Sequence, residues 1–184
     1  RTGRNFIWHM FQARPGGGAS SAGDGWSSIG EWHTVGGIKF GSIEVDEARF
    51  PLRFRHHEFR AGSGGAGQYR GGLGVDLELV FETETVSLGN TAGEGVRHRP
   101  PGLLGGEDGA PHVYRLLSEG RPPRVLRTKE AAIAIHPGDV LDVHSSGGGG
   151  WGPRDKRAPE AVARDRVQGL LADDSASEGE PRGC

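Results

Sequence analysis

The chain has 184 residues, of which 34 are glycine and 11 are proline, and its 22 Lys and Arg nearly balance its 24 Asp and Glu. Nothing in this balance points to a nucleic-acid or membrane partner, and no apolar run approaches the roughly 20 residues of a membrane-spanning helix. The single cysteine, Cys184, excludes an internal disulfide framework and favours a reducing, cytoplasmic compartment.

The first half of the chain predicts short strands. The apolar run at residues 6–12 fits a buried strand or half of a helix equally well. Residues 31–45 carry apolar side chains among glycines and predict one or two short strands. Residues 52–60 follow Pro51 and predict a strand with one solvated face.

The clearest strand signal lies at residues 75–82, where apolar and acidic residues alternate with a period of two. Further strands are predicted at 112–118, 124–128, 131–136 and 140–144. The spacing of strands and turns indicates a mainly β fold of antiparallel, glycine-rich sheets in a sandwich or barrel-like arrangement. The alternative is an α+β portion of a larger domain.

One helix is predicted near the C-terminus. Pro159 suits a first helical position, and Ala163, Val167, Leu170 and Leu171 recur at helical spacing. The acidic residues 173–184 have nothing to bury and predict a disordered tail. We therefore expect one domain over residues 1–172.

Glycine clusters separate the predicted strands. They lie at residues 16–18, 62–67, 71–74, 102–106 and 147–152. Because glycine loses the most backbone entropy on folding, such clusters indicate tight corners and close approach of backbones. No phosphate-binding signature of the form Gly-x4-Gly-Lys-Ser/Thr occurs, so the clusters do not predict a nucleotide site.

The polar candidates have ordinary explanations as well as functional ones. His56 and His57 would face opposite sides of a strand, so one metal ion could not bind both, and we assign no metal ligand in this chain. His144 adjoins the last glycine cluster. If they have no other role, Ser63 is a serine in a turn, Asp24 is an aspartate in a turn, and Arg70 is a charge at the end of a strand.

The order of the motifs carries a resemblance. They are residues 43–47, 50–52, 63–74, 100–106, Lys129, 137–139 and 147–155. Together they resemble the C-terminal part of the hydantoinase B and 5-oxoprolinase family, to which the alpha subunits of acetone and acetophenone carboxylases are related. No single glycine cluster would carry this resemblance.

The resemblance implies part of an ATP-dependent hydrolase that opens a cyclic amide such as a hydantoin, 5-oxoproline or a lactam. A hydantoinase A-like partner subunit would supply the ATP chemistry, and a divalent metal of the complete protein would have its ligands outside this chain. On this reading the isolated chain is inactive. The alternatives are a subunit of an ATP-dependent ketone carboxylase and a non-catalytic assembly fragment.

The resemblance also implies substrate-binding residues, although it assigns no catalytic ones. They would offer hydrogen bonds and backbone N–H groups to the substrate or its developing oxyanion. The expected residues are Asp24, Gly25, Ser63, Gly64, Gly65, Arg70, Gly147, Gly148, Gly149 and Gly150.

Overall fold

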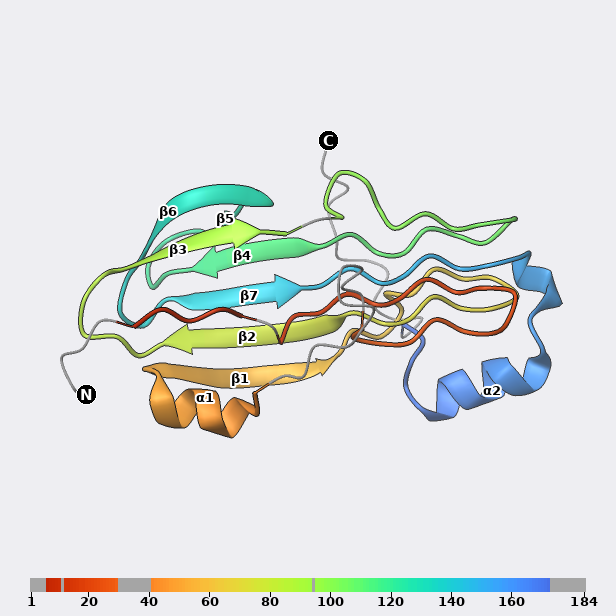
Figure 1. The fold of residues 1–184 in the computed structure, drawn as a ribbon, viewed down its shortest axis with the longest axis horizontal. Helices are drawn as coiled ribbons and strands as arrows, with labels where there is room; N and C mark the ends of the chain where they lie inside the picture. The colour runs from red at the N-terminus through yellow and green to blue at the C-terminus, as the bar shows by residue number, and fades with distance from the viewer. Residues whose placement is uncertain (1–5, 11, 30–40, 94, 173–184) are drawn as a thin grey trace.

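The computed structural model describes residues 6–10, 12–29, 41–93 and 95–172. Two antiparallel sheets organise one half of the molecule (Figure 1). The larger sheet has the order β1 (Leu52–Phe59), β2 (Val75–Phe81), β7 (Val140–His144), β4 (Val113–Leu117) and β5 (Arg124–Val125). The smaller sheet pairs β3 (Ser87–Ala92) with β6 (Lys129–Ile135). This confirms a mainly β, antiparallel fold, and the sheets do not close into a barrel.

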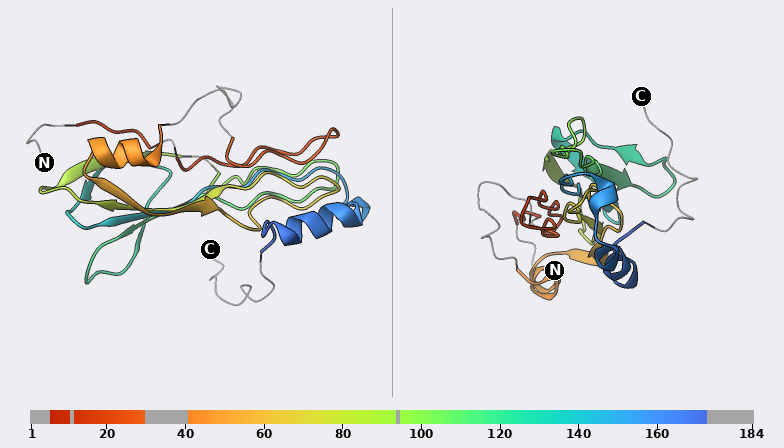
Figure 2. Two further views of the ribbon diagram at one scale, coloured as in Figure 1. Left: turned by 90° about the horizontal axis from the view of Figure 1, so that it is seen from below. Right: turned by 90° about the vertical axis from the view of Figure 1, so that its right-hand side faces the viewer.

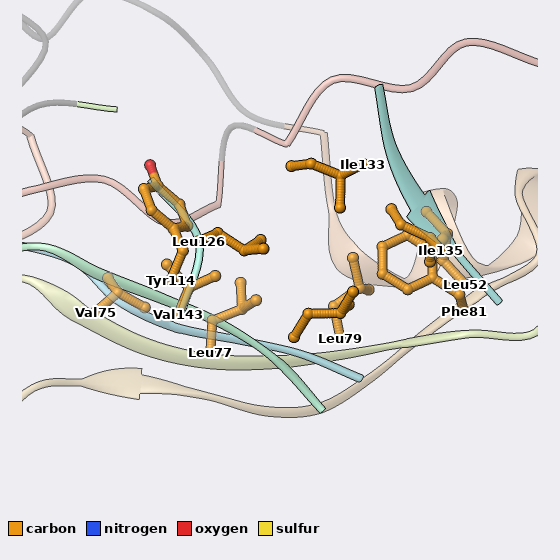
Figure 3. Packing of buried hydrophobic residues seen from close by; sticks show 11 residues of the cluster. Leu52, Val75, Leu77, Leu79, Phe81, Tyr114, Leu126, Ile133, Ile135 and Val143 are labelled. Atoms are coloured by element: carbon orange, nitrogen blue, oxygen red, sulfur yellow. The ribbon is translucent and has the colours of Figure 1, made fainter. Parts of the chain in front are cut away.

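The hydrophobic core lies on one face of the larger sheet. Leu77 pairs with Val143 and Leu79 with Leu141, so the alternating residues of β2 point to one side. Ile133 and Ile135 of β6 pack against them from above (Figure 3). The strand predicted at 75–82 is therefore confirmed, and its polar residues form the opposite face.

The apolar run at residues 6–12 is neither strand nor helix in its described part. Two of its side chains, Trp8 and Met10, nevertheless pack against the buried cluster, whereas Ile7 is 84% exposed. The prediction of a regular element is wrong for the described part of this run, and burial holds for only part of it.

A first helix, α1 (Ile43–Arg49), stands where the sequence favoured a strand. The Ser42 side chain accepts the N–H of Val45, and Glu44 and Asp46 lie in the positively polarised first turn. These capping signals outweigh the β-branched residues that suggested a strand. The rest of that predicted segment, residues 31–40, lies outside the described residues, as does the predicted tail at 173–184.

The second helix, α2 (Pro159–Val167), follows a short 3₁₀ helix at Arg154–Lys156. It is shorter than predicted, and the residue that it buries is Asp165. Val167, which we expected on an apolar face, is 90% exposed. Within the described part of the chain, neither helix is long and apolar enough to cross a bilayer.

The glycine-rich segments form the other half of the molecule, where extended chains run side by side without regular strand pairing (Figure 1). We call this region the glycine bundle and define it as residues 15–19, 24–26, 63–74, 100–110 and 145–152. At its centre the Gly148 N–H donates to the Gly72 carbonyl, and the Gly148 carbonyl accepts the Gly65 N–H, both at 2.9 Å.

Only glycine fits at the centre of the bundle. A Cβ atom on Gly148 would lie 1.9 Å from the Gly17 carbonyl oxygen, and one on Gly72 would lie 2.0 Å from the Trp26 carbonyl oxygen. Glycine is required here for the same reason as at the crowded axis of collagen, where only glycine fits. The predicted close approach of backbones is confirmed.

Candidate functional site

A cleft of about 300 Å³ opens where the glycine bundle meets α2. Asp24 and Tyr69 line it from the bundle, and Arg157 and Arg164 line it from the C-terminal segment. Figure 2 shows α2 lying alongside the end of the bundle that is remote from the sheets. The cleft therefore depends on contacts between segments that are far apart in the sequence.

Asp24 is the centre of these contacts. Arg157 donates to both of its carboxylate oxygens, with Nη1 at 2.8 Å and Nη2 at 2.9 Å. The backbone N–H of Arg70 donates to Oδ1 at 2.7 Å. This two-point pairing is the strong geometry of an arginine and a carboxylate, and it fixes the position of the carboxylate.

Asp165 extends the network into α2. Its Oδ2 accepts from Arg157 Nη2 at 2.6 Å and lies 3.4 Å from Arg70 Nε. Arg70 Nη1 in turn donates to the Gly71 carbonyl at 2.6 Å. Both Arg70 and Asp165 are buried, so two cations and two carboxylates neutralise one another inside this junction.

The network keeps Asp24 and Arg157 charged. Burial opposes ionisation of Asp24, but hydrogen bonds from Arg157 and Arg70 outweigh it and lower the pKa of the carboxyl. The hydrogen bond to Asp24 raises the pKa of Arg157. Asp24 therefore remains an ionised partner of Arg157, which suits it to holding a structure or ligand and not to taking up a proton.

Ser63 occupies a buried corner beside the bundle. Its Oγ donates to the Arg60 carbonyl at 2.6 Å and accepts the Gly74 N–H at 2.9 Å. The side chain thereby satisfies two backbone groups where the chain leaves β1 and enters the bundle. This is the turn role that the sequence offered as its ordinary explanation.

The structure brings the expected glycines together. Gly65 and Gly148 are hydrogen bonded, and the Gly25 N–H donates to the Arg70 carbonyl at 2.8 Å. A Cβ atom on Gly64 would lie 2.1 Å from the Gly71 carbonyl oxygen, and one on Gly149 would lie 1.9 Å from that of Pro101. These glycines therefore face neighbouring backbones.

Of the four candidate glycines at residues 147–150, three already use their N–H groups within the bundle. Gly147 donates to Ala110, Gly148 to Gly72, and Gly150 to the Glu107 carbonyl. An oxyanion placed against these N–H groups would have to displace a backbone carbonyl. The hydrogen bonds favour a bracing role for this segment.

Sequence reasoning missed Arg157 and Asp165. Asp24 and Arg157 are 133 residues apart, so no local pattern connects them. The sequence offered one signal for Asp165, namely a carboxylate in a predicted helix that is polar on most of its surface. Helical spacing drew attention to Val167 instead, because apolar side chains are the usual sign of a buried face.

The cleft can accept a ligand through its remaining cations. Lys156 and Arg164 line it beside the neutralised pair of Asp24 and Arg157. Such a surface suits acceptor oxygens, for example those of an amide, a carboxylate or a phosphate group. The described residues do not fit a divalent metal, since no group of three or more His, Cys, Asp or Glu side chains among them could hold one.

Comparisons with known proteins connect this architecture to one family. The family model described as hydantoinase B/oxoprolinase matches residues 1–154. The caprolactamase subunit beta of Pseudomonas jessenii is 30% identical over 166 residues, which cover 88% of this chain and 28% of the relative. The 5-oxoprolinase 1 of Arabidopsis thaliana is 28% identical over 137 residues, which cover 74% of this chain and 11% of the relative.

Two solved structures have the same fold over most of the chain. The crystal structure of the ATP-dependent caprolactamase from Pseudomonas jessenii matches with a TM-score of 0.74 at 29% identity, over 88% of this chain and 28% of that one. The nucleotide-free acetone carboxylase matches with a TM-score of 0.68 at 24% identity, over 90% and 26%. The chain thus spans little more than a quarter of these proteins.

Proposed function

Because this chain belongs to the hydantoinase B/oxoprolinase family, we propose that it is the C-terminal part of an ATP-dependent hydrolase that opens cyclic amides. One observation carries the proposal: 88% of this chain matches the structure of the ATP-dependent caprolactamase, with a TM-score of 0.74. The substrate class is a hydantoin, 5-oxoproline or a lactam. A hydantoinase A-like partner subunit supplies the ATP chemistry, and the complex is cytoplasmic.

The role of this chain follows from its contacts. The closely packed backbones of the glycine bundle support the substrate cavity. The ion pairs of Asp24 with Arg157 and of Arg70 with Asp165 hold α2 against the bundle. Gly25, Ser63, Gly64, Gly65 and the cluster Gly147, Gly148, Gly149 and Gly150 support that cavity through their contacts with neighbouring backbones and do not line it. The isolated chain is inactive, because it does not bind ATP and the divalent metal of the complete enzyme is held elsewhere.

The test is an assay of the complete protein that carries this chain, combined with its ATP-binding partner. Hydantoin, 5-oxoproline and caprolactam are each added with ATP, and ADP and the ring-opened product are measured. We expect one ring to stimulate ADP release and to be opened. If no ring stimulates ADP release, or if a ketone with bicarbonate does so instead, the proposal fails.

A further inference from the structure

The face of the larger sheet opposite the core carries a row of charged residues. Asp76 of β2 lies directly opposite His144 of β7, and Glu78 lies opposite Asp142. Arg115 of β4 pairs with Asp142 from the other side. Alternation along these strands places all five side chains on the face that the core does not use.

A cavity of about 370 Å³ opens on this face. It is lined by two histidines and three carboxylates, namely His56, His144, Asp76, Glu78 and Asp142, together with Arg55 and Leu77. His144 is part-exposed, with 25% of its side chain accessible. The imidazole can therefore contact both its protein partners and a molecule in the cavity.

His144 is held from both ends of its ring. Its Nδ1 lies 2.6 Å from Asp76 Oδ1, a carboxylate and imidazole pair in which Nδ1 carries the proton. Its Nε2 lies 3.1 Å from Arg115 Nη1 and 3.3 Å from Asp142 Oδ1. Nδ1 thus has one fixed partner, Asp76, whereas Nε2 has both a donor, Arg115, and an acceptor, Asp142, nearby.

This arrangement satisfies both protonation states of the ring. When Nε2 carries a proton, it donates to Asp142; when it does not, its lone pair accepts from Arg115. Arg115 Nη1 also lies 3.4 Å from the other oxygen of Asp142, so neither partner is stranded by the change. Loss or gain of the Nε2 proton therefore leaves no buried group unpaired.

The backbone fixes the position of the ring. Ser145, the next residue, is fully buried, and its Oγ accepts the Val75 N–H at 2.6 Å and donates to the Arg14 carbonyl at 2.8 Å. Two residues further on, Gly147 enters the centre of the glycine bundle. The bundle thus anchors the strand end that presents His144 to the cavity.

From this geometry we propose that His144 is the residue that donates a proton to the ring nitrogen of a cyclic amide bound in this cavity. The inference rests on the proposed function and adds a catalytic residue to it. In the step, the oxygen of water bonds to the carbonyl carbon and the C–N bond breaks, with its electron pair going to nitrogen. The ring nitrogen of the amide takes the proton of His144 Nε2. A proton released by the added water then reprotonates Nε2.

The electrostatics agree with a proton donor. The hydrogen bond to Asp76 raises the pKa of His144, burial opposes the rise, and the charge of Asp142 adds to it. Arg60, whose Nε lies 3.8 Å from Asp76 Oδ1, lowers the pKa in part. The other ionisable groups that surround the ring are Arg115, Arg55, His56, Glu78 and His112.

The first test follows the ring nitrogens of His144 by ¹⁵N NMR in the full 184-residue chain. We expect Nδ1 to stay protonated while Nε2 titrates, and we expect Asp76→Asn to move the midpoint to lower pH. Asp155→Asn, in an exposed position, is the matched control. A midpoint that Asp76→Asn leaves unchanged, or an Nε2 that does not titrate, overturns the inference.

The second test measures turnover in the complete enzyme with its partner. His144→Gln should lower kcat by about 100-fold or more with little change in KM, the range for loss of a general acid. His98→Gln, which replaces an exposed histidine away from the cavity, should leave turnover unchanged. Asp76→Asn should move the alkaline limb of the pH profile to lower pH, which a purely structural role would not do.

The outcomes separate the two proposals. A wild-type complex that opens no ring refutes the proposed function. A wild-type complex that opens a ring while His144→Gln retains its turnover and pH profile refutes only the role of His144.

Discussion

Arg157 donates to both carboxylate oxygens of Asp24, at 2.8 and 2.9 Å, across 133 residues of sequence. Its Nη2 also donates to Asp165 within the same C-terminal segment. One guanidinium therefore joins the glycine bundle to α2, and the stability of that junction depends on a planar, forked donor.

Replacing the guanidinium of Arg157 should weaken the contact between the glycine bundle and α2. Arg157→Leu removes the cation that Asp24 shares with the buried Asp165, which keeps only Arg70 nearby, and because Asp24 is one-third exposed we expect a loss of about 2 kcal/mol in the free energy of unfolding. Arg157→Lys keeps the charge and should recover only part of the loss. Urea denaturation measures both. The control is Arg154→Leu, whose side chain is 75% exposed and should matter little. Equal stability of Arg157→Leu and wild type would contradict this account.

The glycine bundle predicts a sharp contrast between two of its glycines. A Cβ atom on Gly148 would lie 1.9 Å from a carbonyl oxygen, so Gly148→Ala must push two backbones apart. The nearest atom to a Cβ atom on Gly18 is 3.9 Å away. We expect thermal unfolding to show a loss of about 3 kcal/mol or more for Gly148→Ala and of less than about 1 kcal/mol for Gly18→Ala. Similar losses for the two variants would contradict close packing of backbones.

Stability should depend on pH through His112. Burial lowers the pKa of this imidazole to about 4 from 6.5, with help from the charges of Arg60 and His144. Between those two values the unfolded chain binds more protons than the folded one, so stability falls as pH falls from 6.5 towards 4. The full shift corresponds to roughly 3 kcal/mol.

The matched variant is His112→Phe, which keeps a ring against Tyr114, whose ring centroid lies 4.4 Å from that of His112. Unfolding experiments between pH 7 and pH 4 should show a smaller loss of stability in this variant than in wild type. Parallel curves for the two proteins would mean that His112 does not titrate as described.

Ser145→Ala should destabilise the strand end that carries His144. The hydroxyl bonds both the Val75 N–H and the Arg14 carbonyl in a fully buried position. Because its loss leaves two buried backbone groups without a hydrogen-bond partner, we expect the free energy of unfolding to fall by about 1–3 kcal/mol. Hydrogen exchange of the Val75 amide should speed up in the variant, whereas unchanged protection would argue against this anchor.

The sequence predicted most of the strands because their alternation reflects burial on one face. The alternation of Leu77 and Leu79 with acidic residues is an example, and it also placed Asp76 on the polar face. β3 was missed because Ser87–Ala92 offers only Leu88 as a bulky apolar side chain, and Leu88 is 74% exposed. Pairing with β6 forms this strand, and such pairing leaves no local trace in the sequence.

The site was less predictable than the fold. The glycine clusters showed that backbones approach closely, and the structure joins Gly65 to Gly148 and Gly25 to Arg70. Which cluster meets which depends on contacts far apart in the chain, and so does the pairing of Asp24 with Arg157. The neighbours of His144 come from three different strands for the same reason.

The most direct test of the proposed function is a mass spectrum of the products formed by the complete complex with ATP, a cyclic amide, a ketone and ¹³C-bicarbonate in ¹⁸O-labelled water. Hydrolysis predicts a ring-opened product that carries ¹⁸O in its new carboxylate and no ¹³C. A ¹³C-labelled carboxylate derived from the ketone, with the cyclic amide left intact, would contradict the account.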